Sequence, residues 1–172
     1  FLAQGALYFG MLMYTVMLPI MIYRIIFAEQ IPDAAQPTLA ILAAPASLSL
    51  AGYFTMVTQP PPVIIGGLFG IAILMTLIIY TAFFKLLRRR FCPGFAAFTF
   101  PMVIGATALF KLADWMLTMN VDMQFINQIH YLAVFELLVA SAVVGYVAIR
   151  YTHYFNPLAS KWLEYKTNRQ LS

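Results

Sequence analysis

The sequence predicts an all-α integral membrane protein with five transmembrane helices. Of its 172 residues, 63% are hydrophobic and only 9% are charged, whereas soluble domains are near half apolar and a quarter charged. The mean hydropathy is +0.85. Five apolar stretches each approach or exceed the roughly 20 residues that a helix needs to cross a bilayer. None of them alternates polar and apolar residues as membrane barrel strands do, so we expect helices.

The five expected spans follow one another through short links. They cover residues 2–27, 38–57, 63–87, 94–117 and 125–151. Short links make neighbouring helices antiparallel partners, so residues 1–155 are expected to form one transmembrane helical domain. The polar tail, residues 156–172, is expected to hold a short interfacial helix with Trp162 and Tyr165 at the level of the lipid headgroups.

The basic residues predict the orientation of the chain. Nine of the ten lie at or beyond the ends of the first, third and fifth spans, and these are Arg24, Lys85, Arg88, Arg89, Arg90, Arg150, Lys161, Lys166 and Arg169. The ends of odd-numbered spans lie on one side of a membrane, and the positive-inside rule makes that side the cytoplasm. The C-terminal tail is then cytoplasmic. The net charge of +4 is explained by this topology, so the lipid bilayer is the expected partner and nucleic acid is not.

The first, third and fifth spans consist mostly of large apolar residues, and Pro19 in the first span has no polar face around it. The second span differs, because Ala40, Ala44, Ser47 and Ala51 recur at helical spacing. Such a small face permits close packing or leaves room for a conduit, and close packing is the expectation from this pattern alone. Pro45 lies within the span and is expected to kink the helix and free the carbonyl of Ile41.

The fourth span repeats this design with Pro101 in its interior, which is expected to free the carbonyl of Ala97. Steps of three and four residues place an aromatic ring, a hydroxyl and two charges on one helix face. That face holds Phe100, Ile104, Thr107, Lys111 and Asp114.

Charged side chains inside a bilayer are costly and mark functional or structural contacts. Lys111 in the fourth span and Glu136 in the fifth are expected at similar depth, so we predict an ion pair between them. The pair either pins two helices together or contacts the substrate. Asp114 and His130 are expected to form a shallower polar layer.

Signatures of enzymatic chemistry are missing from the sequence. The one cysteine, Cys92, has no evident activating partner, and His130 and His153 are too far apart on one helix to ligate a common iron. There is no zinc-ligand spacing, no glycine-rich phosphate loop and no hydrolase serine motif. We therefore expect no enzyme activity, no cofactor and no metal.

Two segments resemble the tellurite-resistance/dicarboxylate transporter family. They are Pro37-Thr38 followed by Ala43-Ala44-Pro45-Ala46-Ser47-Leu48 and Gly52-Tyr53, and Pro93-Gly94-Phe95-Ala96-Ala97-Phe98-Thr99-Phe100-Pro101. This family includes the bacterial TehA proteins, the malic acid permeases of yeasts and the slow-type anion channels of plant guard cells. The resemblance extends over essentially the whole chain.

The resemblance implies a ten-helix pore built of five helical hairpins, with odd-numbered helices inside. This chain would supply helices six to ten, so that its second and fourth spans are inner helices. The chain begins at Phe1 within an apolar run, and we expect it to be part of a longer protein whose N-terminal half completes the pore. The resemblance also implies a homotrimer, a bacterial inner membrane, and a phenylalanine gate at the position of Phe100.

The sequence thus predicts a channel or facilitator for small anions with a largely neutral pore, gated by Phe100, kinked at Pro45 and Pro101. Ser47, Thr107, Lys111, Asp114, His130 and Glu136 are the candidates for pore-facing or paired polar residues. One alternative is a proton-coupled carrier of C4-dicarboxylate, tellurite or sulfite, in which Asp114, His130 and Glu136 carry protons. Another is a membrane scaffold or assembly subunit that transports nothing.

Overall fold

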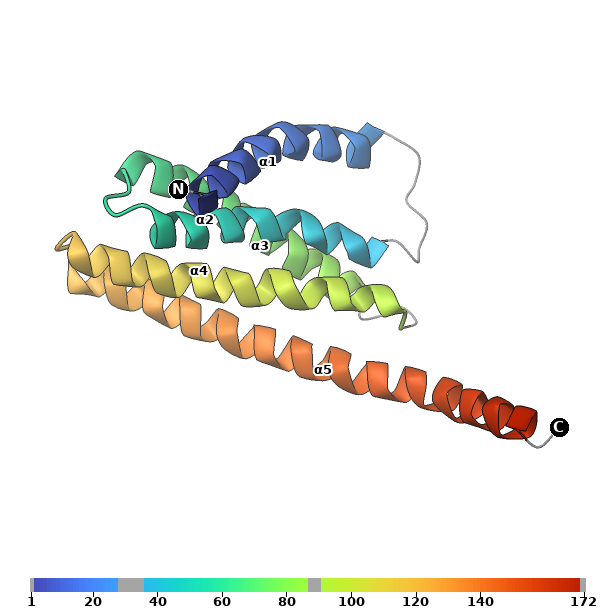
Figure 1. Ribbon diagram of the computed structural model, residues 1–172. Helices are drawn as coiled ribbons and strands as arrows, with labels where there is room; N and C mark the ends of the chain where they lie inside the picture. Colours follow the sequence, from blue (N-terminus) through green and yellow to red (C-terminus); the bar gives the residue numbers. More distant parts are fainter. Residues whose placement is uncertain (1, 28–35, 87–90, 171–172) are drawn as a thin grey trace.

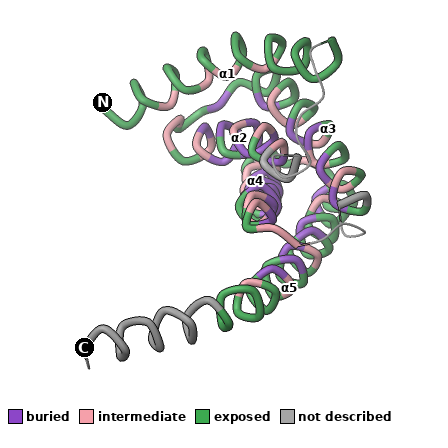
Figure 2. Tube along the Cα trace, turned by 90° about the vertical axis from the view of Figure 1, so that its right-hand side faces the viewer, coloured by how far each residue is buried: buried purple, intermediate pink, exposed green. Residues whose placement is uncertain are grey.

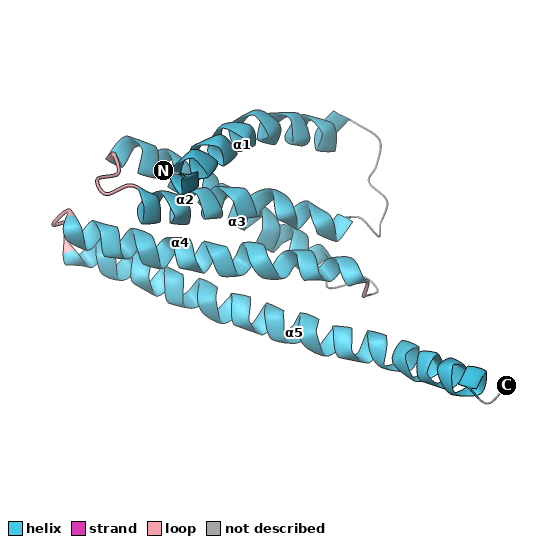
Figure 3. Cartoon of the chain, viewed as in Figure 1, coloured by secondary structure: helices cyan, strands magenta, loops and turns pink. Residues whose placement is uncertain are grey.

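The protein is described here from a computed structural model, which describes residues 2–27, 36–86 and 91–170. In this part of the chain all regular structure is helical (Figure 3). The five α-helices are α1 (Leu2–Phe27), α2 (Ala44–Met56), α3 (Pro62–Leu86), α4 (Thr99–Thr118) and α5 (Met123–Gln170). Two 3₁₀ segments, η1 (Gln36–Ala43) and η2 (Pro93–Phe98), precede α2 and α4.

The predicted class is confirmed, because the described residues contain five helical stretches that are long and apolar enough to cross a membrane. These stretches are Leu2–Phe27, Leu39–Met56, Pro62–Phe84, Pro93–Thr118 and Met123–Pro157. The second and fourth are composite, since each joins a 3₁₀ segment to the α-helix that follows it.

Successive helices run in opposite directions, and the connections alternate between the two ends of the bundle (Figure 1). Arg24 near the end of α1 and Arg150 in α5 therefore lie toward the same end. The basic run Arg88 to Arg90 lies outside the described residues. Viewed along the bundle, α1, α3 and α5 follow an outer curve, and α2 and α4 lie on its inner side (Figure 2).

The buried core is concentrated on α2 and α4, whereas α1 has no buried residue. The small face predicted on the second span is buried, with Ala40, Ala44, Ser47 and Ala51 all below a tenth exposed. Small side chains let helix backbones approach closely, which is how helices associate in lipid without a hydrophobic driving force. This face therefore serves close packing, the simpler of its two interpretations.

α4 and α5 form an antiparallel hairpin (Figure 1), in which the Glu136 side chain packs against α4 at Gly105. A Cβ atom added to Gly105 would lie 2.3 Å from Glu136 Oε1 and 3.1 Å from Glu136 Cδ. Only a residue without a side chain leaves this space for the carboxyl group. In the hairpin Glu136 therefore lies opposite Gly105, with its carboxyl group beside the α4 backbone.

At the end of the bundle that holds Arg24 and Arg150, aromatic side chains connect η2 and the residue Phe91 before it to α5. The Tyr151 hydroxyl donates a hydrogen bond to the Pro93 carbonyl. The Phe91 ring packs edge-on against Tyr151, with ring centroids 5.4 Å apart, and the Arg150 guanidinium lies 5.4 Å from the Phe91 centroid. A guanidinium at this distance is attracted by the ring face.

α5 continues without a break through the expected boundary between transmembrane domain and tail at residue 155. Its 48 residues correspond to about 72 Å of helix, more than twice the roughly 30 Å of the hydrocarbon core. The tail is thus the extension of the last span rather than a separate short helix. The side chains of Trp162 and Tyr165, expected at the headgroups, lie outside the described residues.

A hydrogen bond from α1 reaches the backbone at the junction of η1 and α2. In the 3₁₀ pattern a carbonyl is bonded by the N–H three residues later, and for Leu42 that residue is Pro45, which has no N–H. The Tyr14 hydroxyl of α1 donates to the Leu42 carbonyl at 3.0 Å. We expect Tyr14→Phe to lower the free energy of unfolding by about 1 kcal/mol, because a part-buried carbonyl loses its donor.

Thermal unfolding of the purified full-length protein in detergent measures this effect. Tyr23→Phe is the matched control, because Tyr23 is exposed on the same helix and its ring contact with Phe27 is kept in the variant. Equal unfolding temperatures for Tyr14→Phe and the control would contradict the assignment.

Candidate functional site

α4 presents two chemically different sides. Its buried side consists of Pro101, Met102, Gly105, Ala106, Ala108, Leu109, Leu112 and Ala113. The row predicted from helical spacing lies on the opposite, open side, where Phe100 is 53% exposed and Thr107 and Asp114 are also exposed. Ile104 and Lys111 in the same row are half-buried. We call Phe100, Ile104, Thr107, Lys111 and Asp114 the α4 row.

The α4 row offers an aromatic ring, a hydroxyl and two charges along one helix face. The Thr107 hydroxyl donates to the Val103 carbonyl at 3.0 Å, so its oxygen can still accept a hydrogen bond. No residue of the described chain forms an ion pair with Lys111. An ammonium group with no carboxylate partner can attract an anion more strongly than a neutralised one.

The two prolines lie where the backbone changes from 3₁₀ to α. Pro45 is the second residue of α2, and Pro101 is the third residue of α4. A proline is accommodated in the first turn of an α-helix, where its missing N–H has no partner to lose. The expectation of a kink inside a continuous α-helix was therefore wrong. In the 3₁₀ register the carbonyl left without a donor before Pro45 is that of Leu42 rather than that of Ile41.

The predicted ion pair between Lys111 and Glu136 is not formed. Glu136 is only 4% exposed, and its Oε1 atom has no hydrogen-bond partner among the described residues. The reason is the register of the hairpin. Lys111 lies seven residues before the end of α4 at Thr118, whereas Glu136 lies thirteen residues after the start of α5 at Met123. Glu136 therefore reaches the level of Gly105 and not that of Lys111.

The predicted polar layer of Asp114 and His130 is not formed within the described chain either. Both side chains are exposed, and no hydrogen bond or ion pair joins them. The His130 ring instead packs edge-on against Phe110, with centroids 5.5 Å apart. His130 thus lies at the depth of Phe110 and its neighbour Lys111.

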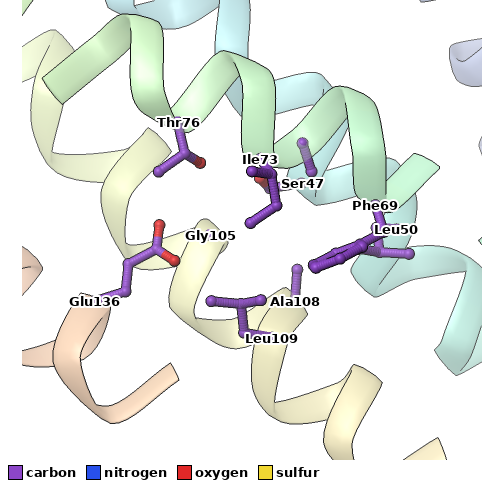
Figure 4. Close-up of a pocket in the computed structure, with 10 residues that line it drawn as sticks. Ser47, Leu50, Phe69, Ile73, Thr76, Gly105, Ala108, Leu109 and Glu136 are labelled. Carbon is purple, nitrogen blue, oxygen red and sulfur yellow. The ribbon is translucent and has the colours of Figure 1, made fainter. Parts of the chain in front are cut away.

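Glu136 borders a cavity of about 10 Å³ between four helices (Figure 4). Its lining comprises Ser47 and Leu50 from α2, Phe69, Ala72, Ile73 and Thr76 from α3, Gly105, Ala108 and Leu109 from α4, and Glu136 from α5. The candidate polar residues are consequently divided between two places. Ser47 and Glu136 meet at this cavity, and Thr107, Lys111 and Asp114 lie on the open side of α4.

Sequence reasoning did not single out Thr76, Tyr80 or Gly105. Thr76 contributes a hydroxyl to the cavity, and the Tyr80 hydroxyl, one turn further along α3, is buried without a hydrogen-bond partner among the described residues. The spacing of four residues between Thr76 and Tyr80 was the available signal, because it places two hydroxyls on one face of a largely apolar helix. Among the described residues, no group of three His, Cys, Asp or Glu could hold a metal ion.

Comparison with known proteins identifies the family. A family model described as voltage-dependent anion channel (SLAC1) matches residues 1–152 of this chain. No curated protein and no solved structure matches this chain. The match covers well over half of the 172 residues and agrees with the resemblance seen in the proline-containing motifs of the second and fourth spans. The chain belongs to the voltage-dependent anion channel family.

Proposed function

We propose that this chain forms half of the wall of an anion-conducting pore, with α2 and α4 as inner helices. The observation that supports this proposal is the α4 row. Its Thr107 and Asp114 are exposed and its Lys111 is half-buried, whereas the opposite side of the helix is packed on its neighbours. Polar and charged side chains in a membrane helix normally face a bundle interior or a water-filled cavity, because exposure to lipid is costly. Their open side is therefore the expected lining of a conduit.

Selection of anions follows from the same groups. A permeating anion would lose part of its hydration shell and contact hydroxyls such as that of Thr107 and the positive ends of helix dipoles. Lys111 supplies a positive charge on the α4 row, and its lack of an ion pair with Glu136 favours a direct role in attracting the anion. The other charged side chain of the α4 row is Asp114, whose negative charge offsets that of Lys111. The row therefore has little net charge, which suits passage of small anions without tight binding.

Phe100 is the proposed gate. It is the residue immediately before Pro101, and its ring is exposed on the α4 row beside the change from 3₁₀ to α geometry. A large apolar ring in a narrow pore blocks ions by excluding water. The 3₁₀ segment that precedes α4 has poorer hydrogen-bond geometry than an α-helix, so the backbone next to the gate is suited to rearrangement.

Completion of the pore requires a further set of inner helices. We propose that this chain supplies helices six to ten of a ten-helix protein, and that its N-terminal half provides the remaining wall. The open inner side of the curve formed by the helices supports this proposal (Figure 2). We also propose a homotrimer in a bacterial inner membrane, with the C-terminal end of α5 in the cytoplasm, as the clustering of basic residues indicates.

Removal of the gate is the most direct test. We expect Phe100→Ala in the full-length protein to raise anion flux into liposomes by about tenfold or more, equivalent to lowering a barrier by at least about 1.4 kcal/mol. Phe135→Ala is the matched control, because Phe135 on α5 is exposed to a similar degree, 58% against 53%. Its flux should equal that of the wild type.

The same assay separates the rival functions. Unchanged or lower flux in a well-folded Phe100→Ala variant would remove Phe100 from the gate. Wild-type uptake that saturates with substrate and requires a pH gradient would identify a proton-coupled carrier of C4-dicarboxylate, tellurite or sulfite instead. No flux in any form, together with purification in a fixed complex, would identify a scaffold subunit.

Lys111 provides an independent test of the electrostatic part of the proposal. We expect Lys111→Met to reduce anion flux on the order of tenfold, because the α4 row loses its positive charge. Lys111→Arg keeps that charge and should retain most of the flux. The reduction should be largest at low ionic strength, since salt screens exposed charges. Equal flux in Lys111→Met and Lys111→Arg, measured in the open Phe100→Ala background, would show that this charge does not act on the anion.

A further inference from the structure

The carboxyl group of Glu136 is the main polar group that anion passage leaves unexplained. It is 4% exposed, its Oε1 atom lacks a hydrogen-bond partner among the described residues, and it points into the cavity between α2, α3, α4 and α5 (Figure 4). A buried carboxyl group without partners is costly, because it has given up its hydrogen bonds to water. A ligand in the cavity would restore them.

The size and chemistry of the cavity restrict that ligand. Its volume of about 10 Å³ is close to what a single water molecule needs. Only Ser47, Thr76 and Glu136 contribute side-chain oxygens to the lining, whereas hard metal cations in proteins usually take six or more oxygen ligands. An anion is disfavoured by the carboxylate itself. The described lining residues include no lysine, arginine or histidine that could neutralise the carboxylate.

We propose that Glu136 and this cavity form a proton-binding site that is separate from the anion path. One water molecule in the cavity contacts Glu136 Oε1 and the hydroxyls of Ser47 and Thr76. A proton reaches the site on this water, binds Oε1 of the carboxylate and leaves a neutral water molecule behind. Release follows the reverse path, so charge and atoms balance at each step.

The titratable groups on the helices around the cavity support a proton-binding site in which Glu136 is the acid. From α3, Tyr80 lies one turn beyond Thr76 and has a buried hydroxyl. From α4, the described lining residues are Gly105, Ala108 and Leu109, while Lys111 and Asp114 belong to the open α4 row. From α2, Ser47 and Leu50 carry no charge, and on α5 itself His130 is exposed. Glu136 is thus separated from the groups proposed to contact the anion.

Infrared difference spectroscopy tests the proposal without any transport assay. Spectra of the full-length protein in lipid are compared between alkaline and acidic buffer. We expect acidification of the wild type to produce a protonated-carboxyl C=O band that is lost in Glu136→Gln and kept in Asp114→Asn. The band should move to lower frequency in D₂O, because the proton exchanges through the cavity water.

Identical acid-induced spectra for the wild type and Glu136→Gln would overturn the proposal. So would the same spectral change produced by sodium ions at constant pH, which would make the ligand a metal cation. Should Glu136→Gln fail to fold, Thr76→Val keeps the acid and removes a cavity hydroxyl, so its Glu136 band should shift. Thr81→Val is the matched control, since Thr81 is exposed on the same helix and bonds its own backbone. A Thr76→Val band that coincides with the control would contradict the bridging water.

Discussion

The close approach of α4 and α5 at Gly105 is the contact on which the arrangement of polar groups depends. Because Gly105 has no side chain, the Glu136 carboxyl occupies the space beside the α4 backbone. Glu136 thus lies opposite Gly105, on the buried side of α4 that contacts α5, α2 and the cavity. With one side committed to packing, Phe100, Thr107 and Asp114 remain on the open side. A residue of any other type at this position would require Glu136 to move.

The two inner helices share a construction that is unusual for membrane spans. The 3₁₀ segment η1 leads into α2 near Pro45, and the 3₁₀ segment η2 leads into α4 near Pro101. In lipid, backbone groups without partners are costly, and the structure supplies donors from neighbouring helices. Tyr14 of α1 bonds the Leu42 carbonyl, and Tyr151 of α5 bonds the Pro93 carbonyl. Outer helices thus stabilise irregular backbone in the inner ones.

Much of this fold could be predicted from the sequence, because long apolar stretches have few alternatives in a membrane. Helical spacing also placed the α4 row correctly on one face, since that inference needs only the period of the helix. The relative depth of Lys111 and Glu136 could not be predicted, because it depends on where the turn between α4 and α5 begins and ends. The expected depth of Glu136 was wrong by six residues, so that Glu136 lies opposite Gly105 and not opposite Lys111. The change from 3₁₀ to α geometry near Pro45 and Pro101 could not be predicted either, since the hydropathy pattern is the same for a continuous α-helix.

The uninterrupted course of α5 has a mechanical consequence. From Pro157 to Gln170 the helix extends about 20 Å past the apolar stretch. Where α5 does not bend, a sideways displacement of its far end tilts the segment that carries Glu136. That segment bears directly on the backbone of α4, a little more than one turn from Phe100. Force applied to this extension therefore has a short path to the α4 row, which is proposed to line the conduit, and Pro157 is the point at which bending would absorb that force.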